Sequence, residues 1–156
     1  MIKILIAGEG GQGVQVIAEI LAKAAFQEGQ KSSYIPNFGV EQRGGVSLAF
    51  VVIDNQPIIY PKFAKADIVA IFSQRSHERI KEYLDEKTRI IKGPAITQKD
   101  AGLPSRVWNV WVLGQINKEG QMVKKESLVK ALEERFTKQF SQNPELRELD
   151  LKALNA

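Results

Sequence analysis

A glycine-rich turn near the N-terminus carries the first chemical signal of this sequence. Residues 8–13 are Gly-Glu-Gly-Gly-Gln-Gly, and they separate an apolar run at 2–7 from a stretch at 14–25 whose apolar residues recur at helical spacing. Glycines let the backbone turn tightly and approach a ligand, while the N–H groups and the dipole at a helix start favour an anion such as a phosphate. The candidate binding residues of the turn are Gly8, Gly10, Gly11, Gln12 and Gly13.

The same turn satisfies the G-x-G-x-x-G pattern of dinucleotide-binding domains, but the rest of that fingerprint is missing. Such domains place an acid about twenty residues further on, at the end of the second strand, where it holds a ribose. Here the expected second strand at 32–35 is followed by Pro36 and contains no carboxylate, and Glu9 inside the turn would repel a pyrophosphate. Three interpretations stay open: an anion or partner contact, glycines that only permit close strand–helix packing, and, least favoured, a dinucleotide site.

A second loop, at residues 36–45, combines a proline, an aromatic residue, an acid and a base two residues apart, and a pair of glycines. In a doubly wound sheet this loop and the glycine-rich turn both follow the carboxyl ends of strands, which is the edge where ligands bind. The candidate binding residues here are Glu41, Arg43 and Gly44. For the loop in isolation, a surface role in which Glu41 and Arg43 pair with each other or with solvent is the open alternative.

The remaining pattern is that of an α/β protein. Strands are expected at 2–7, 32–35, 46–53, 58–60, 67–72 and 88–91, and the turn at 54–57 suggests that 46–53 and 58–60 form a β-hairpin. Helices are expected at 14–25, 76–85 and 126–140, with a loop at 93–105. Residues 107–116 fit a helix or a strand equally well by periodicity. The expected fold is a single Rossmann-like three-layer α/β domain over residues 1–156, with a mostly parallel sheet and an inserted β-hairpin.

The composition limits the chemistry of the chain. The sequence has no cysteine and one histidine, so we expect no disulfide, no cysteine-ligated cluster and no histidine-based metal site. We also recognise no acidic metal site and assign no catalytic residue. The net charge of +4 comes from basic residues that are interleaved with acids, which predicts solvated helix faces and no nucleic-acid partner. The apolar start is too short for a membrane span and lacks the leader of a signal peptide. We therefore expect a cytoplasmic protein without membrane contact.

The two loops, taken in order, resemble those of the gamma subunits of 2-oxoacid:ferredoxin oxidoreductases. This group includes the pyruvate, ketoisovalerate, 2-oxoglutarate and indolepyruvate enzymes. The shared patterns are a G-x-G-G-Q-G turn and a P-x-[YF]-G-x-E-x-R-G-G loop, and residues 66–70, 94–96 and 109–114 resemble further family segments. In the family the last of these segments opens a helix, which favours a helix at 107–116. Phe38 departs from the commoner tyrosine.

This resemblance implies a subunit of a complex that oxidatively decarboxylates a 2-oxoacid to acyl-CoA and reduces ferredoxin. It implies that the chain alone binds no cofactor and is inactive, and that thiamine diphosphate, magnesium and [4Fe–4S] clusters are held by alpha, beta and delta (ferredoxin-like) partner subunits. Coenzyme A would bind at a shared site, where N–H groups of Gly11 to Gly13 and the Arg43 guanidinium could meet its phosphates. An intersubunit contact by Glu41 and Arg43 stays open, as does self-association of the isolated chain.

Two other classes of function remain as alternatives. One is a free-standing Rossmann-like nucleotide-binding protein or dehydrogenase, against which the missing strand-end acid argues. The other is an assembly subunit without a ligand of its own. The sequence does not indicate which 2-oxoacid the complex would use.

Overall fold

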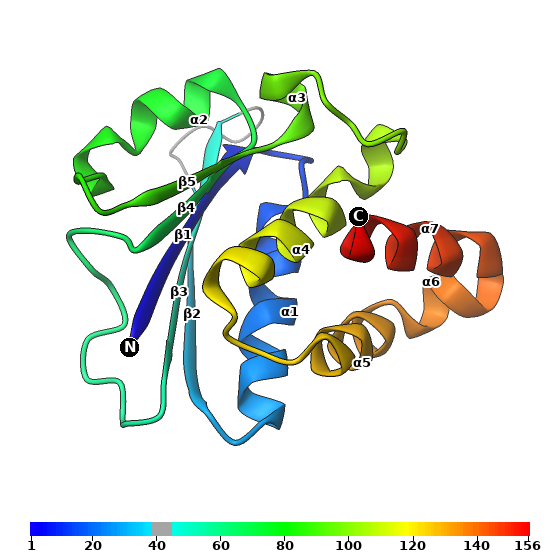
Figure 1. Ribbon diagram of the computed structural model, residues 1–156, viewed down its shortest axis with the longest axis horizontal. Coiled ribbons are helices and arrows are strands. Elements are labelled where there is room, and N and C mark those ends of the chain that lie inside the picture. The colour runs from blue at the N-terminus through cyan, green and yellow to red at the C-terminus, as the bar shows by residue number, and fades with distance from the viewer. Residues whose placement is uncertain (39–44) are drawn as a thin grey trace.

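A computed structural model describes residues 1–38 and 45–156, which form a five-stranded sheet with helices on both faces (Figure 1). The strand order is β2-β3-β1-β4-β5. The strands are β1 (Ile2–Glu9), β2 (Lys31–Phe38), β3 (Val46–Asp54), β4 (Ile68–Ile71) and β5 (Arg89–Lys92). β4 pairs in parallel with β1 and β5, whereas β3 runs antiparallel to its neighbours β1 and β2. The predicted mixed α/β fold with a mostly parallel sheet is confirmed.

The antiparallel hairpin of this sheet joins β2 to β3, and the predicted pairing of 46–53 with 58–60 was wrong. Residues 58–60 form no strand. β3 lies inside the sheet, and Val51 pairs with Ile4 of β1 on one side and with Tyr34 of β2 on the other. Because both edges of β3 are occupied, no edge remains for residues 58–60. A short sequence signal for a turn could not reveal this, since the choice depends on strands far apart in the sequence.

Helices cover the two faces of the sheet unequally (Figure 1). One face carries α1 (Val14–Gln27) and α4 (Trp108–Gly120), with α5 (Lys125–Arg135), α6 (Thr137–Gln142) and α7 (Pro144–Asn155) packed beyond them. The other face carries α2 (Gln74–Arg79) and the 3₁₀ turn η1 (Lys81–Tyr83). The connection from β5 to α4 contains the short helix α3 (Pro94–Thr97) and the 3₁₀ turn η2 (Ser105–Val107). No helix in the described residues is long and apolar enough to cross a membrane.

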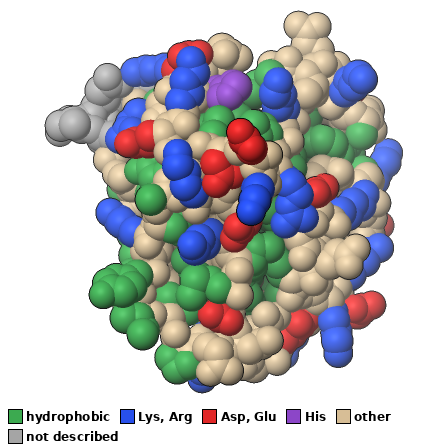
Figure 2. Space-filling view, turned by 60° about the vertical axis from the view of Figure 1, so that its left-hand side comes forward, with side chains coloured by type: hydrophobic (Ala, Val, Ile, Leu, Met, Phe, Trp, Pro, Cys, Tyr) green, Lys and Arg blue, Asp and Glu red, His purple; other side chains and the backbone are tan. Residues whose placement is uncertain are grey.

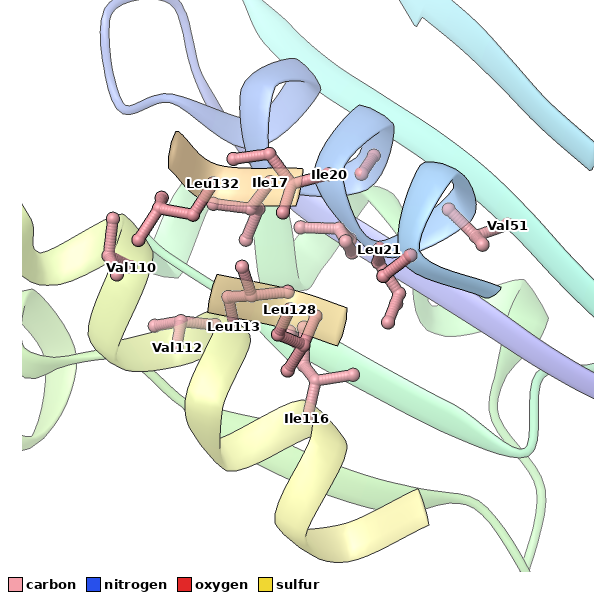
Figure 3. Close-up of a cluster of buried hydrophobic side chains, with 14 of the residues drawn as sticks. Ile17, Ile20, Leu21, Val51, Val110, Val112, Leu113, Ile116, Leu128 and Leu132 are labelled. Carbon is pink, nitrogen blue, oxygen red and sulfur yellow. The ribbon is translucent and has the colours of Figure 1, made fainter. Parts of the chain in front are cut away.

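The larger core cluster lies between the sheet and helices α1, α4 and α5 (Figure 3). Ile17 and Leu21 of α1 pack with Leu113 of α4 and Leu128 of α5, and none of the four is more than 2% exposed. Burying one such side chain stabilises the fold by about 1.5–3 kcal/mol. Alternate residues of the strands point to the other face, where a smaller cluster forms with α2, η1 and the loop before β4.

The predicted helix at 126–140 forms in two pieces. α5 ends at Arg135 and α6 begins at Thr137, because Phe136 has φ −112° and ψ 21° and so leaves helical geometry. The Thr137 hydroxyl donates to the carbonyl oxygen of Glu133 at 2.9 Å, an interaction that often accompanies helix bending.

Other predicted elements are confirmed with shifted ends. Residues 107–116 lie mostly in helix α4, as the family resemblance implied. The helix expected at 76–85 begins two residues earlier, because the Ser73 side chain accepts from the Ser76 N–H at 3.1 Å and caps the helix. It ends at Arg79 and is followed by η1.

Candidate functional site

The glycine-rich turn joins the carboxyl end of β1 to the first turn of α1. Gly11 and Gly13 have φ angles of 87° and 78°, in the left-handed region that favours glycine. Gly13 is the N-cap residue of α1, and no side chain of the described residues caps the helix there. The first N–H groups of α1 have no intrahelical acceptor, as at any helix start, and within the described part of the chain they have no side-chain cap either. They lie at the positive end of the helix dipole. This geometry favours an anion.

Hydrogen bonds within the turn and to β3 brace it. The N–H of Glu9 donates to Oε1 of Gln12 at 2.7 Å, and the N–H of Gln12 donates to the Glu9 carbonyl oxygen at 3.2 Å. The N–H of Gly10 donates to the carbonyl oxygen of Gly45 at 3.3 Å, next to the start of β3. The turn is thus held in one shape, and the N–H groups at its end are pre-positioned.

A cleft of about 340 Å³ opens beside the turn. Gly11–Gly13 form one wall, Phe72 follows β4, Pro94 begins α3, and Arg106 and Asn109 come from η2 and α4. The cleft therefore lies at the carboxyl ends of β1, β4 and β5, the edge at which doubly wound sheets bind ligands. Its volume is within the range of small-molecule sites.

The structure brings only some of the predicted binding residues together. Gly11–Gly13 line the cleft, whereas Gly10 faces Gly45. A β-carbon at Gly8 would stand 2.7 Å from Cγ2 of Val14, so Gly8 permits the close strand–helix packing that was one open interpretation of the turn. Glu41, Arg43 and Gly44 lie outside the residues that the structure describes.

Arg106 gives the cleft its positive charge, and Asp150 of α7 lies behind it. Among the described lining residues, Arg106 is the only charged side chain, and it is exposed. Asp150 is 4% exposed. Burial raises the pKa of the Asp150 carboxyl to about 6, and the nearby Arg106 guanidinium opposes this rise. Arg106 was not among the residues predicted from the sequence, because it follows the expected loop at 93–105. Its short distance from the family-like segment at 109–114 was the available signal.

Gln15 fixes the first turn of α1 to the hairpin strands. Its Nε2 donates to the Ser47 hydroxyl and to the Leu48 carbonyl oxygen, both at 2.8 Å. The Tyr34 hydroxyl donates to Oε1 of Gln15 at 2.5 Å, and burial raises the pKa of this hydroxyl. The helix start that borders the cleft is therefore tied to both β2 and β3.

Glu9 brings a negative charge into the turn, and Arg75 of α2 offsets it. Nη1 of Arg75 lies 3.7 Å from Oε1 of Glu9. Both side chains are substantially exposed, so the pair contributes only about 0–1 kcal/mol to stability. It nevertheless places a cation beside Glu9. The expected repulsion between Glu9 and a pyrophosphate bound at the turn is therefore weaker than the sequence alone suggests.

Trp108 belongs to the core and also lines the cleft. Its Nε1 donates to the Leu103 carbonyl oxygen at 3.0 Å, and its ring, like that of Trp111, is partly buried against the larger core cluster. Both tryptophans therefore pack in the fold.

The donor groups of the chain do not fit an iron–sulfur cluster. Such clusters are held by cysteine thiolates, and the sequence contains no cysteine. Within the described part of the chain, no three His, Asp or Glu side chains are grouped so that they could hold a metal ion.

Sequence comparison places the chain among oxidoreductase subunits. Residues 3–100 match the sequence profile of a family described as pyruvate ferredoxin/flavodoxin oxidoreductase. The common gamma subunit of the pyruvate and ketoisovalerate oxidoreductases of Pyrococcus furiosus is 32% identical over 164 residues, which cover 88% of each chain. The pyruvate synthase subunit PorC of Methanothermobacter thermautotrophicus is 33% identical over 156 residues, covering 87% of this chain and 86% of that subunit.

Solved structures share the fold. The gamma subunit of a keto/oxoacid ferredoxin oxidoreductase from Geobacter sulfurreducens has a TM-score of 0.77 at 23% identity and covers 99% of this chain and 95% of that one. The 2-oxoglutarate:ferredoxin oxidoreductase from Magnetococcus marinus has a TM-score of 0.83 at 18% identity, over 99% of this chain and 30% of that chain. That structure contains 2-oxoglutarate, coenzyme A and succinyl-CoA.

The fold and these relatives define a class, the α/β subunits of oxidoreductases that act on 2-oxoacids. The chain belongs to the pyruvate ferredoxin/flavodoxin oxidoreductase family, and its relatives are gamma subunits of 2-oxoacid:ferredoxin oxidoreductases. The resemblance drawn from the two loops is confirmed.

Proposed function

We propose that this chain, as a single domain of residues 1–156, is the gamma-type subunit of a 2-oxoacid:ferredoxin oxidoreductase and helps to form its coenzyme A site. The complex converts a 2-oxoacid, coenzyme A and oxidised ferredoxin into acyl-CoA, carbon dioxide and reduced ferredoxin. Partner alpha, beta and delta (ferredoxin-like) subunits hold the thiamine diphosphate, magnesium and [4Fe–4S] clusters, which stabilise the carbanion and carry electrons. We place this complex in the cytoplasm.

The observation that carries the proposal is the cleft in which the start of α1 and Arg106 converge. Coenzyme A presents a pyrophosphate and a 3′-phosphate. The N–H groups of Gly11, Gly13 and the first turn of α1 suit one of these anions, and the Arg106 guanidinium suits another through charge-assisted hydrogen bonds. The amide of Asn109, in the same wall, adds a neutral donor. The coenzyme A in the related oxidoreductase of Magnetococcus marinus supports this choice of ligand.

The role of this chain is to bind and orient, and none of its residues needs to move a proton. Holding the phosphates at a fixed point restricts the rest of coenzyme A, so its thiol can be directed toward the partner subunits. Binding energy from such a non-reacting part of a substrate contributes to catalysis by positioning the reacting part. The braced turn suits this task because its N–H groups are already in place.

Glu41, Arg43 and Gly44 join the proposal on the resemblance of their loop alone. In this proposal Arg43 supplies a second cation for a coenzyme A phosphate, and Glu41 orients it. An intersubunit contact by the same pair is the alternative.

Reconstitution tests the proposed function. The isolated chain should show no 2-oxoacid-dependent reduction of ferredoxin or viologen dye, because it lacks ligands for the electron-carrying clusters. Adding the alpha, beta and delta subunits should restore coenzyme A-dependent reduction, and omitting only this chain should abolish acyl-CoA formation. Turnover by the chain alone, or full activity of a complex without it, would contradict the proposal.

A further inference from the structure

A second hollow lies near the amino end of β1, at the opposite end of the strands from the cleft. It is a groove of about 480 Å³ between the start of β1, at Met1 and Lys3, and the loop that connects β3 to β4. We call it the loop groove, and its loop side is formed by residues 57–65. β1 has eight residues, so at ~3.3 Å per residue roughly 25 Å separates the loop groove from the glycine-rich turn.

Large apolar side chains stand out from the loop groove. Ile59 is 78% exposed, Tyr60 is 80% exposed and Met1 is 62% exposed, and all three line the groove. Figure 2 turns the left-hand side of Figure 1 forward and shows hydrophobic side chains projecting at the lower left of the molecule. Small-molecule sites keep such side chains inside a concave wall. Projecting aromatic and aliphatic residues instead resemble the anchors that insert into a partner protein.

The charged side chains that line the loop groove are all basic. Lys3, Lys62 and Lys65 line it together with apolar residues, and its described lining includes no carboxylate. The Nζ of Lys65 donates to the carbonyl oxygens of Glu82 and Leu84 at 2.8 and 3.0 Å, which fixes this cation in place. The groove therefore presents a positive rim in which Lys65 is already held in place.

Acids at the same end of the strands are already engaged. Asp54 pairs with the amino group of Met1 at 3.5 Å, and Asp67 accepts the backbone N–H of Lys3 at 2.8 Å. They limit the positive charge, so the rim is too small and too mixed for a nucleic-acid backbone, which is bound by many cations. A partner surface with a few carboxylates beside an apolar pocket complements this small positive rim better than a nucleic acid does.

We propose that the loop groove is the docking surface for an acidic segment of a partner subunit in the oxidoreductase complex. Tyr60 and Ile59 insert into an apolar pocket of that subunit, and the lysines face its carboxylates. The inference rests on the proposed function, because its occupant is one of the partner subunits. Desolvated anchors supply most of the affinity, while the charges set orientation and association rate. Docking here leaves the cleft at the other end of the strands uncovered by this contact.

The test uses the complex purified through an affinity tag on this chain after coexpression with its alpha, beta and delta subunits. Tyr60→Ser and Lys62→Glu should each lower the recovery of at least one of these subunits about tenfold, and the loss in Lys62→Glu relative to the wild type should shrink as added salt screens the charges. Phe26→Ser removes a 71% exposed aromatic of α1, and Lys152→Glu reverses a charge on α7; both controls should assemble as the wild type does. Hydrogen exchange of residues 55–65 should slow in the complex relative to the chain alone.

The outcomes separate this inference from the proposed function. Normal assembly of Tyr60→Ser and Lys62→Glu, with unchanged exchange at 55–65, would overturn the docking surface and leave the proposed function standing. A wild-type chain that recovers none of the subunits would overturn both. A doubled mass of the isolated chain that is lost in Tyr60→Ser would assign the groove to a second copy. Binding to phosphatidylserine vesicles that is lost in Lys62→Glu, with normal assembly, would assign it to a membrane. Either result overturns the inference.

Discussion

The side-chain amide of Asn109 occupies the space beside the α-carbon of Gly13, so that a β-carbon on residue 13 would stand 2.3 Å from Nδ2 of Asn109. This contact joins the N-cap of α1 to the first turn of α4 and closes one wall of the cleft. Gly13 also has a φ of 78°, in the left-handed region. Backbone conformation and packing thus require glycine independently.

Gly13→Ala should therefore destabilise the fold by more than backbone strain alone. We expect a loss of roughly 2–3 kcal/mol in the free energy of unfolding, measured by urea titration, as strain and the Asn109 contact add. Gly29→Ala is the matched control, because Gly29 has φ 85° and a β-carbon added there would meet nothing within 4 Å. This control should lose only about 1 kcal/mol. Equal losses in the two variants would show that Asn109 does not constrain residue 13.

Asp150 should make the fold less stable as pH rises. Its folded-state pKa is about 6 against an ordinary 3.8, so the folded state binds the proton more tightly. The stabilising contribution of the protonated form is present below the ordinary pKa and is lost as pH rises through about 6. Asp150→Asn should thus be more stable than the wild type by about 2–3 kcal/mol at neutral pH, with a smaller difference at pH values near 4.5. Urea unfolding at several pH values measures this, and a pH-independent difference would refute it.

The glycine-rich turn could be predicted from sequence because its signals are local. The apolar run at 2–7 predicts a strand, the spacing of Ile17 and Leu21 predicts a helix, and glycines between them predict a tight connection. The structure confirms each of these elements and adds the bracing of the turn by Gln12 and by the hydrogen bond from Gly10 to Gly45.

The features that sequence reasoning missed depend on distant segments. β3 inserts beside β1 through pairs such as Ile4 with Val51, and no local pattern near residues 58–60 distinguishes this pairing from a short hairpin. Arg106 lines the cleft because the connection from β5 to α4 passes along the carboxyl ends of the strands. The loop-like composition of this connection does not reveal its path. The burial of Asp150 could not be predicted from sequence, because it depends on how α7 packs against the rest of the fold.

The isolated chain should not bind NAD, NADP or FAD in the micromolar range. In dinucleotide-binding domains the strand beside β1 ends in the acid that holds the ribose. Here β3 occupies that place and runs the other way, pairing Val46 with Glu9, and β2 ends in Asn37 and Phe38. Isothermal titration calorimetry should give no saturable heat. A clear signal for NAD would favour the dehydrogenase alternative.

Arg106 should matter to the coenzyme A step and not to the steps before it. Removing a charge-assisted hydrogen bond to a phosphate costs about 1.5–3 kcal/mol, which corresponds to roughly a 10- to 150-fold change. Arg106→Lys should recover only part of the loss, because an ammonium does not reproduce the guanidinium fork. Arg79→Ala is the matched control, since Arg79 lies on α2, outside the described lining of the cleft, and pairs with Glu82 at 3.3 Å.

The decisive quantity is the KM for coenzyme A of the assembled complex that carries Arg106→Ala, taken together with its coenzyme A-independent decarboxylation rate. We predict a KM raised at least tenfold, a decarboxylation rate near that of the wild type, and no change in either quantity for Arg79→Ala. An unchanged KM in a fully assembled Arg106→Ala complex would contradict the claim that this cleft binds coenzyme A.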